Sequence, residues 1–482
     1  MLKSADGGLR PVPFPVDDPE RIPVRRYYDE EFYKLELEHL WPHVWQMACR
    51  LEQIPEVGDW VEYSSAGRGV IVVRTESGVK AFHNACRHRG VPIAGGYGNE
   101  CGKVASGNCA QTGFICPFHG WRWNIDGENT LVYGKHIFSD RQLDPEDINL
   151  VPCRLETWAN CAWINHDNGA PSVRETFGPV ADRLDAHGIG DLRMEWWYGT
   201  VLPANWKIAM EAFMEGYHVL TTHPQLSVAR RDALNDMYEL ASGLEGETSQ
   251  AKSRRNLKEG VTTRQTIDAQ FRGMEQLSIG MGGMVHPKEL EIMRSLLDAD
   301  LPDDPMQATG MWFGMVQQKI VDELRAKGEP IPDLNKVAVS DPVNAVEFLF
   351  PHWFVLPVFS SMSSYRIRPL GPESCLFEIW SLTMYPEDAD YTPPLEPTML
   401  PFDSPDFPPI PRQDYSNIPI QQKGLHATGF DFMRLSHTTE GLISNYHQII
   451  DGYLAGRPQE QLTQAIHELG GNFDGPIKNL DL

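Results

Sequence analysis

The chain has 482 residues, of which 41% are hydrophobic and 22% charged, and its formal net charge is −24. This length and apolar content are ample for two or three domains with large cores. The acidic balance argues against a nucleic-acid partner, and eight cysteines in this length do not make a disulfide framework.

The N-terminal third is expected to form a short helical segment and then a small β domain. Residues 27–41 have a mostly apolar face that predicts a helix, and Pro42 should end it. The strands expected in the β domain include 57–63, 69–74 and 155–164. We therefore assign residues 1–45 to an N-terminal segment that packs on the second domain, and 46–166 to the β domain.

The rest of the chain, 167–482, is expected to be a larger α+β domain in which helices cover an antiparallel sheet. Residues 386–420 are so rich in proline and acidic residues that they predict a surface loop. The expected helices are 171–187 and 440–454, and the expected strands are 196–202, 346–359, 364–368 and 376–383. No window approaches eighteen uninterrupted apolar residues, and the first residues have no signal-peptide character, so we expect a cytoplasmic protein.

Two matching Cys/His pairs carry the first functional signal. The first reads Cys86-Arg87-His88 and the second Cys116-Pro117-Phe118-His119. Two thiols and two imidazoles fit a structural zinc site or a Rieske [2Fe–2S] centre, in which two histidines replace two cysteines on one iron. A C-x-H arm is unusual for zinc modules, so the spacing favours the iron–sulfur centre.

The spacer between the pairs, residues 89–115, holds two further thiols, Cys101 and Cys109. We interpret it as an inserted surface loop with free thiols, so neither cysteine is assigned as a ligand. The remaining cysteines, Cys49, Cys153, Cys161 and Cys375, are expected to be small core residues in a reducing compartment.

A second group of possible metal ligands follows Asn205. In a helix, Glu211, Glu215 and His218 would share one face, and Pro224 should break that helix at His223. Two imidazoles on a broken helix, with a distant carboxylate, can hold non-haem Fe(II) with open coordination positions. The alternative is two ordinary histidines near a helix end.

Together, these motifs resemble the alpha subunits of Rieske ring-hydroxylating oxygenases. The resemblance implies that Cys86, His88, Cys116 and His119 bind a [2Fe–2S] cluster, and that His218 and His223 bind a mononuclear iron. It also implies that Glu215 bridges to a Rieske histidine of a neighbouring subunit. The chain departs from the family in its longer spacer, and in Ala212, where the family often has asparagine.

The family usually takes the third iron ligand from an acidic residue just before a C-terminal helix. Glu440 and Gln448 keep the family's spacing, so Glu440 is our predicted third ligand. The alternative is an acidic residue in the first turn of a helix, where the helix dipole favours it. The other ligands considered are His437, Asn445, Asp451 and Asp431.

The resemblance implies a terminal oxygenase that uses O2 and electrons from NAD(P)H, delivered by a separate reductase or ferredoxin. The expected substrate is a small hydrophobic compound, aromatic by family default, and dioxygenation is preferred over monooxygenation or demethylation. A homotrimer is expected, with a beta subunit left open. The alternatives are a Rieske electron carrier or a zinc-stabilised binding protein. The residues considered for the pocket are Met210, Phe213, Met214 and Leu220.

Overall fold

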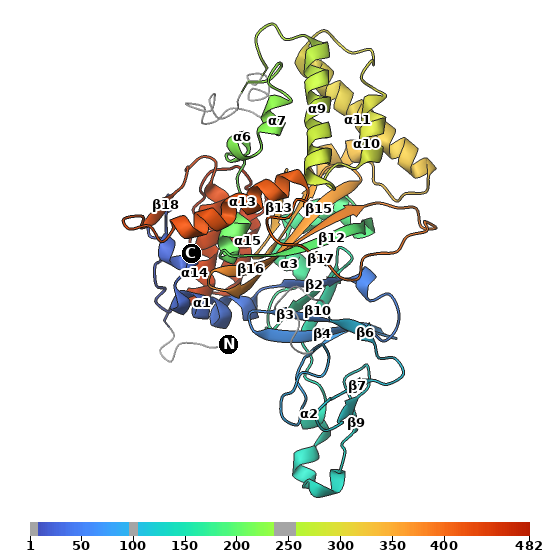
Figure 1. The fold of residues 1–482 in the computed structure, drawn as a ribbon, viewed down its shortest axis with the longest axis vertical. Helices are drawn as coiled ribbons and strands as arrows, with labels where there is room; N and C mark the ends of the chain where they lie inside the picture. The colour runs from blue at the N-terminus through green and yellow to red at the C-terminus, as the bar shows by residue number, and fades with distance from the viewer. Residues whose placement is uncertain (1–7, 96–104, 236–256) are drawn as a thin grey trace.

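A six-stranded sheet lies at the centre of the computed structural model, which describes residues 8–95, 105–235 and 257–482 (Figure 1). Its strand order is β13-β14-β15-β16-β12-β17, and every pair is antiparallel except β12 with β17. The strands are β12 (Arg193–Leu202), β13 (Glu347–Leu349), β14 (Trp353–Pro357), β15 (Ser361–Gly371), β16 (Ser374–Thr383) and β17 (Thr398–Met399). The expected antiparallel sheet is confirmed, although 346–359 forms two strands.

Buried charges join this sheet to the small β domain. Arg366 on β15 faces Glu378 on β16, and its Nε donates to Glu378 Oε2 at 2.8 Å. The same guanidinium donates through Nη1 to the backbone oxygen of Met47 on β2 (Gln46–Arg50) at 2.9 Å. Buried charged hydrogen bonds are costly to break, so they hold the two domains in a fixed relationship.

The small β domain contains three sheets, with strand orders β5-β4-β3-β6, β10-β11-β2 and β7-β8-β9. The expected strand 155–164 is instead a hairpin that turns at Ala159 and Asn160, both of which have positive φ. The strands are β3 (Asp59–Ser65), β4 (Arg68–Thr75), β5 (Gly78–His83), β6 (Ser106–Asn108), β7 (Phe114–Ile115), β8 (Arg122–Trp123), β9 (Asn129–Leu131), β10 (Arg154–Trp158) and β11 (Cys161–Asn165). The β7-β8-β9 sheet and α2 (Pro145–Ile148) form the lower tip of the molecule in Figure 1.

The N-terminal segment pairs with a strand of the larger domain. It contributes β1 (Arg21–Pro23), which pairs with β18 (Phe432–Arg434), and α1 (Glu30–Leu35). A π-helical turn over Glu36–Leu40 and a 3₁₀ turn over Trp41–His43 follow, so the helical prediction is confirmed and Pro42 stands where regular helix has ended.

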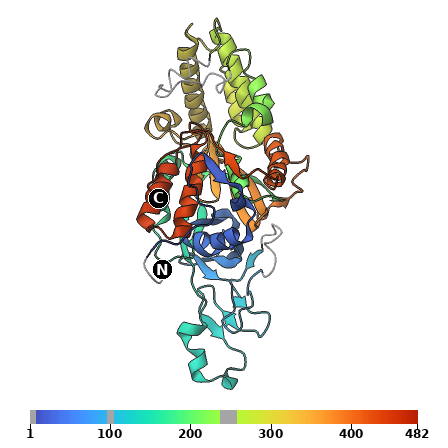
Figure 2. The ribbon, with the colours of Figure 1, turned by 90° about the vertical axis from the view of Figure 1, so that its left-hand side faces the viewer.

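Helices cover the central sheet, and three of them extend beyond it. In Figures 1 and 2, α9, α10 and α11 project from the upper end, opposite the β7-β8-β9 tip. The α-helices not yet given are α3 (Val173–Phe177), α4 (Pro179–Ala186), α5 (Trp206–Glu211), α6 (Val219–Thr222), α7 (Pro224–Val228), α9 (Thr263–Met281), α10 (Pro287–Arg294), α11 (Pro305–Ala326), α12 (Leu334–Ser340), α13 (Pro409–Gly424), α14 (Gly441–Ala455) and α15 (Gln459–Leu469). Short 3₁₀ helices span Val24–Tyr27, Leu51–Gln53, Lys135–Ile137, Asp140–Leu143 and Ile189–Asp191.

The prediction of a loop over 386–420 is wrong in its last part, because α13 begins at Pro409. Pro409 and Pro411 stand in the first turn of this helix, where backbone N–H groups have no partner within the helix, so proline costs little there. Pro419 is the one proline farther inside α13. The proline-rich composition is therefore the reason why the sequence did not predict this helix of about four turns.

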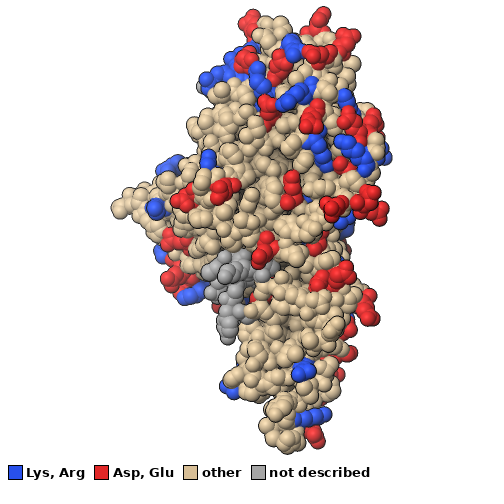
Figure 3. Space-filling model, turned by 45° about the vertical axis from the view of Figure 1, so that its right-hand side comes forward, with Lys and Arg blue, Asp and Glu red and all other residues tan. Residues whose placement is uncertain are grey.

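Charged side chains of both signs gather over the upper, helical part on the face drawn in Figure 3. Within the described residues, no helix combines the length and apolarity needed to span a membrane.

Candidate metal centres

The two Cys/His loops have the same backbone design. Gly90 N–H donates to the oxygen of Cys86 at 2.9 Å, and Gly120 N–H donates to the oxygen of Cys116 at 3.0 Å. Both glycines have positive φ, 79° and 70°, a conformation that favours glycine over residues with a Cβ. Each loop thus forms a tight turn that begins at its cysteine and contains its histidine.

The four side chains form two pairs. His88 Nδ1 and His119 Nδ1 are 3.2 Å apart, while the two buried thiols lie against each other. Burial raises the pKa of Cys86 first of all, and the neighbouring Cys116 raises it further. The His88 ring stacks on Trp121 with centroids 5.1 Å apart, which fixes its orientation.

This pairing separates the two interpretations of the motif. In the described part of the chain, no three of these four donors come within 4.8 Å of one another, as ligands of a single zinc would. A thiol pair and an imidazole pair instead fit two irons, one with cysteine ligands and one with histidine ligands. The residues present therefore fit a Rieske cluster.

The second centre lies where the helix after Asn205 breaks. The α5 helix ends at Glu211, so the expected single helical face for Glu211, Glu215 and His218 is wrong. The short α6 follows, and His223 between α6 and α7 has φ −119° and ψ 58°, outside helical geometry. The expected break before Pro224 is confirmed, and it turns the second imidazole toward the first.

His218 and His223 meet an aspartate that the sequence did not suggest. Asp414 Oδ1, from α13, is 3.0 Å from His223 Nε2 and 3.8 Å from His218 Nε2. The three side chains form one of the two groups in the described chain that could hold a metal ion. Asp414 was missed because it lies in the proline-rich stretch interpreted as a loop.

Both imidazoles are held with Nε2 toward this point. His218 Nδ1 hydrogen-bonds Glu215 Oε1 at 2.8 Å, and His223 Nδ1 hydrogen-bonds Gln413 Oε1 at 2.8 Å. Acceptors at Nδ1 place the proton there and leave Nε2 with its lone pair, which is the usual arrangement of metal-binding histidines. Glu215 also accepts the backbone N–H of His218 at 3.0 Å.

The electrostatics of this centre fit a cation. Asp414 is buried, and its Oδ2 has no hydrogen-bond partner among the described residues. Burial raises the pKa of Asp414, and the two histidines only partly oppose that rise. Burial lowers the pKa of His218, but the hydrogen bond and charge of Glu215 reverse the net direction. Two histidines and a carboxylate are the ligand set of non-haem Fe(II) sites, so the residues present fit that ion.

Glu440 lies apart from the two histidines. Its Oε2 accepts the backbone N–H of Ser436 at 2.7 Å, and Glu440 stands at the N-cap position, directly before the first turn of α14. Glu440, Glu211 and Glu215 line a separate cavity of about 270 Å³. The structure thus brings Asp414, and not Glu440, to the histidine pair.

The other ligands considered are engaged elsewhere or exposed. Asp451 pairs with Arg26 at 2.6 Å, and Asn445 Nδ2 donates to the oxygen of Lys478 at 2.6 Å. His437 and Asp431 are exposed to solvent.

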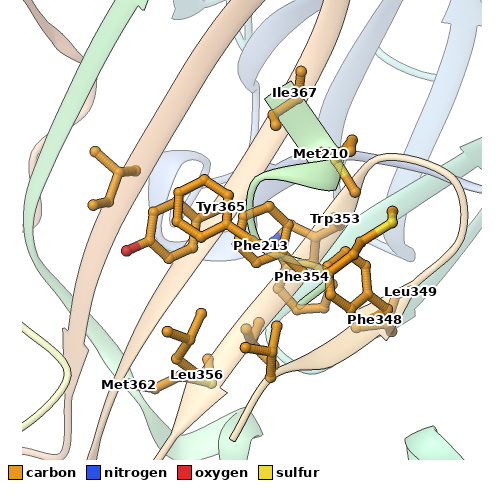
Figure 4. Close-up of a cluster of buried hydrophobic side chains, with 14 of the residues drawn as sticks. Met210, Phe213, Phe348, Leu349, Trp353, Phe354, Leu356, Met362, Tyr365 and Ile367 are labelled. Atoms are coloured by element: carbon orange, nitrogen blue, oxygen red, sulfur yellow. The ribbon is translucent and has the colours of Figure 1, made fainter. Parts of the chain in front are cut away.

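Figure 4 shows a cluster of buried hydrophobic side chains that includes Phe213, Phe354 and Tyr365, and the charge of Asp414 acts on Tyr365. The Phe213 ring lies 4.8 Å from that of Phe354 and 5.1 Å from that of Tyr365. Burial raises the pKa of both Tyr365 and Tyr415, and the charge of Asp414 raises each further. Both hydroxyls are buried without a hydrogen-bond partner in the described chain. Of the residues considered for the pocket, Met210, Phe213 and Met214 are buried and Leu220 is half-buried.

The two centres lie in different domains of the same chain. The loops that carry the Cys/His pairs belong to the lower, small β domain, whereas α6, α7 and α13 lie on the far side of the central sheet (Figure 1).

Comparisons with known proteins agree with this architecture. A family model described as the Rieske [2Fe-2S] domain matches residues 44–134, and one described as the ring hydroxylating alpha subunit (catalytic domain) matches 156–456. The carnitine monooxygenase oxygenase subunit of Escherichia coli is 30% identical over 209 residues, which are 43% of this chain and 53% of that protein. Biphenyl 2,3-dioxygenase subunit alpha of Rhodococcus jostii is 31% identical over 237 residues, 47% of this chain and 48% of that protein.

The chain therefore spans about half the length of the curated relatives that it matches. A solved structure of a naphthalene 1,2-dioxygenase mutant bound to phenanthrene superposes with a TM-score of 0.59 at 19% identity, and the match covers 93% of this chain and 96% of that one. This likeness supports the fold.

Proposed function

Because the chain belongs to the family of ring-hydroxylating alpha subunits, we propose that it is the terminal oxygenase of a Rieske non-haem iron system. The observation that carries the proposal is the second centre, where His218, His223 and Asp414 converge beside a buried aromatic cluster. An electron carrier would need only the small β domain, and a zinc-stabilised binding protein would need neither centre in this form.

The proposed ligands of the mononuclear iron are His218, His223 and Asp414. Asp414 replaces Glu440 in this proposal because its carboxylate faces both Nε2 atoms and has an unpaired oxygen. When bound, such an iron supplies O2 activation, and the [2Fe–2S] cluster supplies single electrons. The chain itself orients the imidazoles through Glu215 and Gln413, and excludes water from one side with apolar rings.

Electron transfer is proposed to run between subunits. The Cys/His loops and the histidine–aspartate centre lie at different levels of one chain, so head-to-tail packing would bring together centres from different copies. Glu215 is the proposed connection, because it is hydrogen-bonded to His218 and lines the 270 Å³ cavity on its other side. The arrangement that we propose is a closed ring of three copies, and a separate reductase or ferredoxin would load the cluster.

Two substrate classes follow from the aromatic cluster. A hydrophobic, aromatic compound is the class expected from the sequence; it would lie beside Phe213, one of the residues considered for the pocket, and dioxygenation stays the prediction for that class. A quaternary ammonium compound would be held by the faces of the same rings through cation–π attraction. The resemblance to a carnitine monooxygenase favours monooxygenation for this second class.

The test is substrate-dependent O2 uptake by the purified protein with NADH and a surrogate reductase. The panel pairs carnitine and choline with biphenyl and naphthalene, and product analysis counts the oxygen atoms incorporated. We expect coupled O2 uptake and a hydroxylated or demethylated product with one class. The proposal would be contradicted if the protein had both iron centres filled and was reduced by the reductase, but took up no O2 with either class of substrate.

A further inference from the structure

A third group of ligand-type side chains lies in the small β domain, away from both iron centres. It consists of His83, Cys153 and His166, whose donor atoms all lie within 4.8 Å of one another. None of them belongs to the Cys/His loops or to the histidine–aspartate centre. In sequence they are separated by 69 and 12 intervening residues, so only the fold brings them together.

Regular backbone hydrogen bonds hold the three residues in place. His83 ends β5, and its N–H donates to the oxygen of Val151 at 2.9 Å. Cys153 N–H donates to the oxygen of Ala81 at 2.9 Å, so the chain before β10 runs along β5. His166 follows β11, one position beyond the Arg154–Asn165 pair, and therefore lies across from Cys153. The cluster is thus preorganised by strands and does not depend on a free loop.

The side-chain geometry is close to that of a metal site. Cys153 Sγ is 3.9 Å from His166 Nδ1, and the two imidazole rings stack with centroids 5.3 Å apart. In a tetrahedral zinc site, Zn–S of about 2.3 Å and Zn–N of about 2.0 Å separate sulfur and nitrogen by about 3.5 Å. A shift of a few tenths of an ångström would therefore bring Cys153 and His166 into range, and the donor atom of His83 lies within 4.8 Å of both. Cys153 is buried, while both histidines are half-buried, so one side stays open to a fourth ligand.

We propose that His83, Cys153 and His166 form a binding site for zinc, with water as the fourth ligand. Two imidazoles and one thiolate are ligands that zinc prefers, whereas the hard cations Mg²⁺ and Ca²⁺ prefer oxygen. The ion would join β5, the segment before β10 and the end of β11, and would act as a structural clip within the small β domain. No step of the proposed oxygenase reaction depends on it.

Some of the charges and pKa shifts around the cluster favour zinc binding, and others oppose it. Burial lowers the pKa of His166 to about 4, with help from His83, Arg68 and His43, and burial and Arg68 lower the pKa of His83. Both imidazoles are therefore neutral near pH 7, which is the form that binds metal. Arg68 opposes a cation, but a Cys153 thiolate would supply a compensating negative charge. Burial raises the pKa of the Cys153 thiol to about 12, so zinc must displace its proton.

The test uses the holoprotein with its Rieske spectrum intact and its mononuclear iron filled. Zinc bound after equilibrium dialysis is measured by elemental analysis in wild type, Cys153→Ser and His166→Gln. Cys109→Ser is the matched control, because Cys109 is a buried thiol of the same domain that contacts the oxygen of Gly58 and belongs to neither ligand group found among the described residues. We expect one more zinc per chain in wild type and Cys109→Ser than in the other two variants.

Cobalt provides a second readout, because a thiolate-to-cobalt band in wild type reports directly on ligation by a cysteine. Wild type and Cys109→Ser should show a thiolate-to-cobalt charge-transfer band that Cys153→Ser and His166→Gln lack. Affinity for zinc should rise about tenfold per pH unit near neutrality, because binding releases the thiol proton. Equal zinc content in wild type and Cys153→Ser, without a thiolate band in wild type, would overturn the proposal. This result would leave the oxygenase assignment untouched, since no activity is measured.

Discussion

Arg26 Nε donates a hydrogen bond to His447 Nδ1 at 3.2 Å, in a fully buried contact between the N-terminal segment and α14. Because a guanidinium has no acceptor, this bond leaves His447 Nδ1 unprotonated and places the imidazole proton on Nε2. His447 Nε2 in turn lies 2.7 Å from Glu211 Oε1, and Tyr27 donates its hydroxyl to the same carboxyl group at 2.9 Å. The N-terminal segment therefore fixes the tautomer of His447 on α14, whose Nε2 faces Glu211 at the end of α5.

The first prediction concerns the pH dependence that Glu211 introduces. Burial, above all, raises its pKa to about 8, with a smaller rise from Glu440. The folded protein thus keeps this proton to about pH 8, whereas the unfolded chain loses it above about pH 4.5, so the free energy of unfolding falls as pH rises between these values. The Tm of wild type should fall from pH 6.5 to 8, and Glu211→Gln should flatten that decline.

Burial lowers the pKa of His447 well below the usual value, so its effect on stability rises with pH through about 6.5, where the unfolded chain titrates, and is nearly complete by about pH 7.5. It therefore opposes the Glu211 effect only at the lower end of the range. Glu291→Gln, at an exposed position, is the control and should keep the wild-type slope. An unchanged slope in Glu211→Gln would contradict the prediction.

A second prediction concerns the buried ion pair of Lys207 and Glu36. Their charged atoms are 2.6 Å apart, both side chains are fully buried, and Trp206 Nε1 also donates to Glu36. Lys207→Met would leave a buried carboxylate without its partner, which costs about 3–5 kcal/mol. Adding Glu36→Leu to that variant should restore much of the loss in chemical denaturation. Lys34→Met, in the exposed pair with Glu31, should change little.

The third prediction concerns the Rieske ligands. Cys86→Ala or His119→Ala should abolish the Rieske absorption and electron paramagnetic resonance signals, because each removes one ligand of a two-iron cluster. Cys109→Ala should keep both signals, since Cys109 Sγ donates to the oxygen of Gly58 at 3.4 Å. Cys101 lies outside the described residues, and Cys101→Ala is likewise expected to keep them. Loss of the signals in either spacer variant would mean that a spacer thiol is a ligand.

The fourth prediction concerns Glu215 as the connection between subunits. Glu215→Gln should keep both iron centres and lower turnover, because an uncharged amide holds His218 Nδ1 less strongly and carries no negative charge toward a neighbouring histidine. The measurement is the rate at which a reduced cluster is reoxidised by O2 with substrate present, alongside iron content and molecular mass. Glu440→Gln, in the same cavity, is the control and should reoxidise at the wild-type rate. An active monomer would contradict the trimeric arrangement.

The sequence predicted the parts of the fold that depend on local chemistry. Spacing in the sequence indicates the two Cys/His pairs, and Pro224 predicts the break at His223. Both signals depend on residues that are close together in the chain. Asp414 could not be found in this way. It is separated from His223 by 190 intervening residues, and only the packing of α13 brings it near. The local sequence could at most have predicted the helix that carries Asp414, and the prolines at the start of α13 made that segment resemble a loop.

The last prediction decides between Asp414 and Glu440 as the third iron ligand. Asp414→Asn keeps the size of the side chain but removes the negative charge that faces His218 and His223, so it should lose mononuclear iron and all oxygenation while it keeps the Rieske spectrum. Glu440→Gln should keep the iron, because Glu440 Oε2 bonds the backbone of Ser436 and faces the other cavity. Iron per chain, corrected for the two cluster irons, is the measurement. Full iron in Asp414→Asn together with loss of iron in Glu440→Gln would return the ligand role to Glu440. Loss in both variants would mean that Glu440 supports the centre through Glu215, whose charge acts on both side chains.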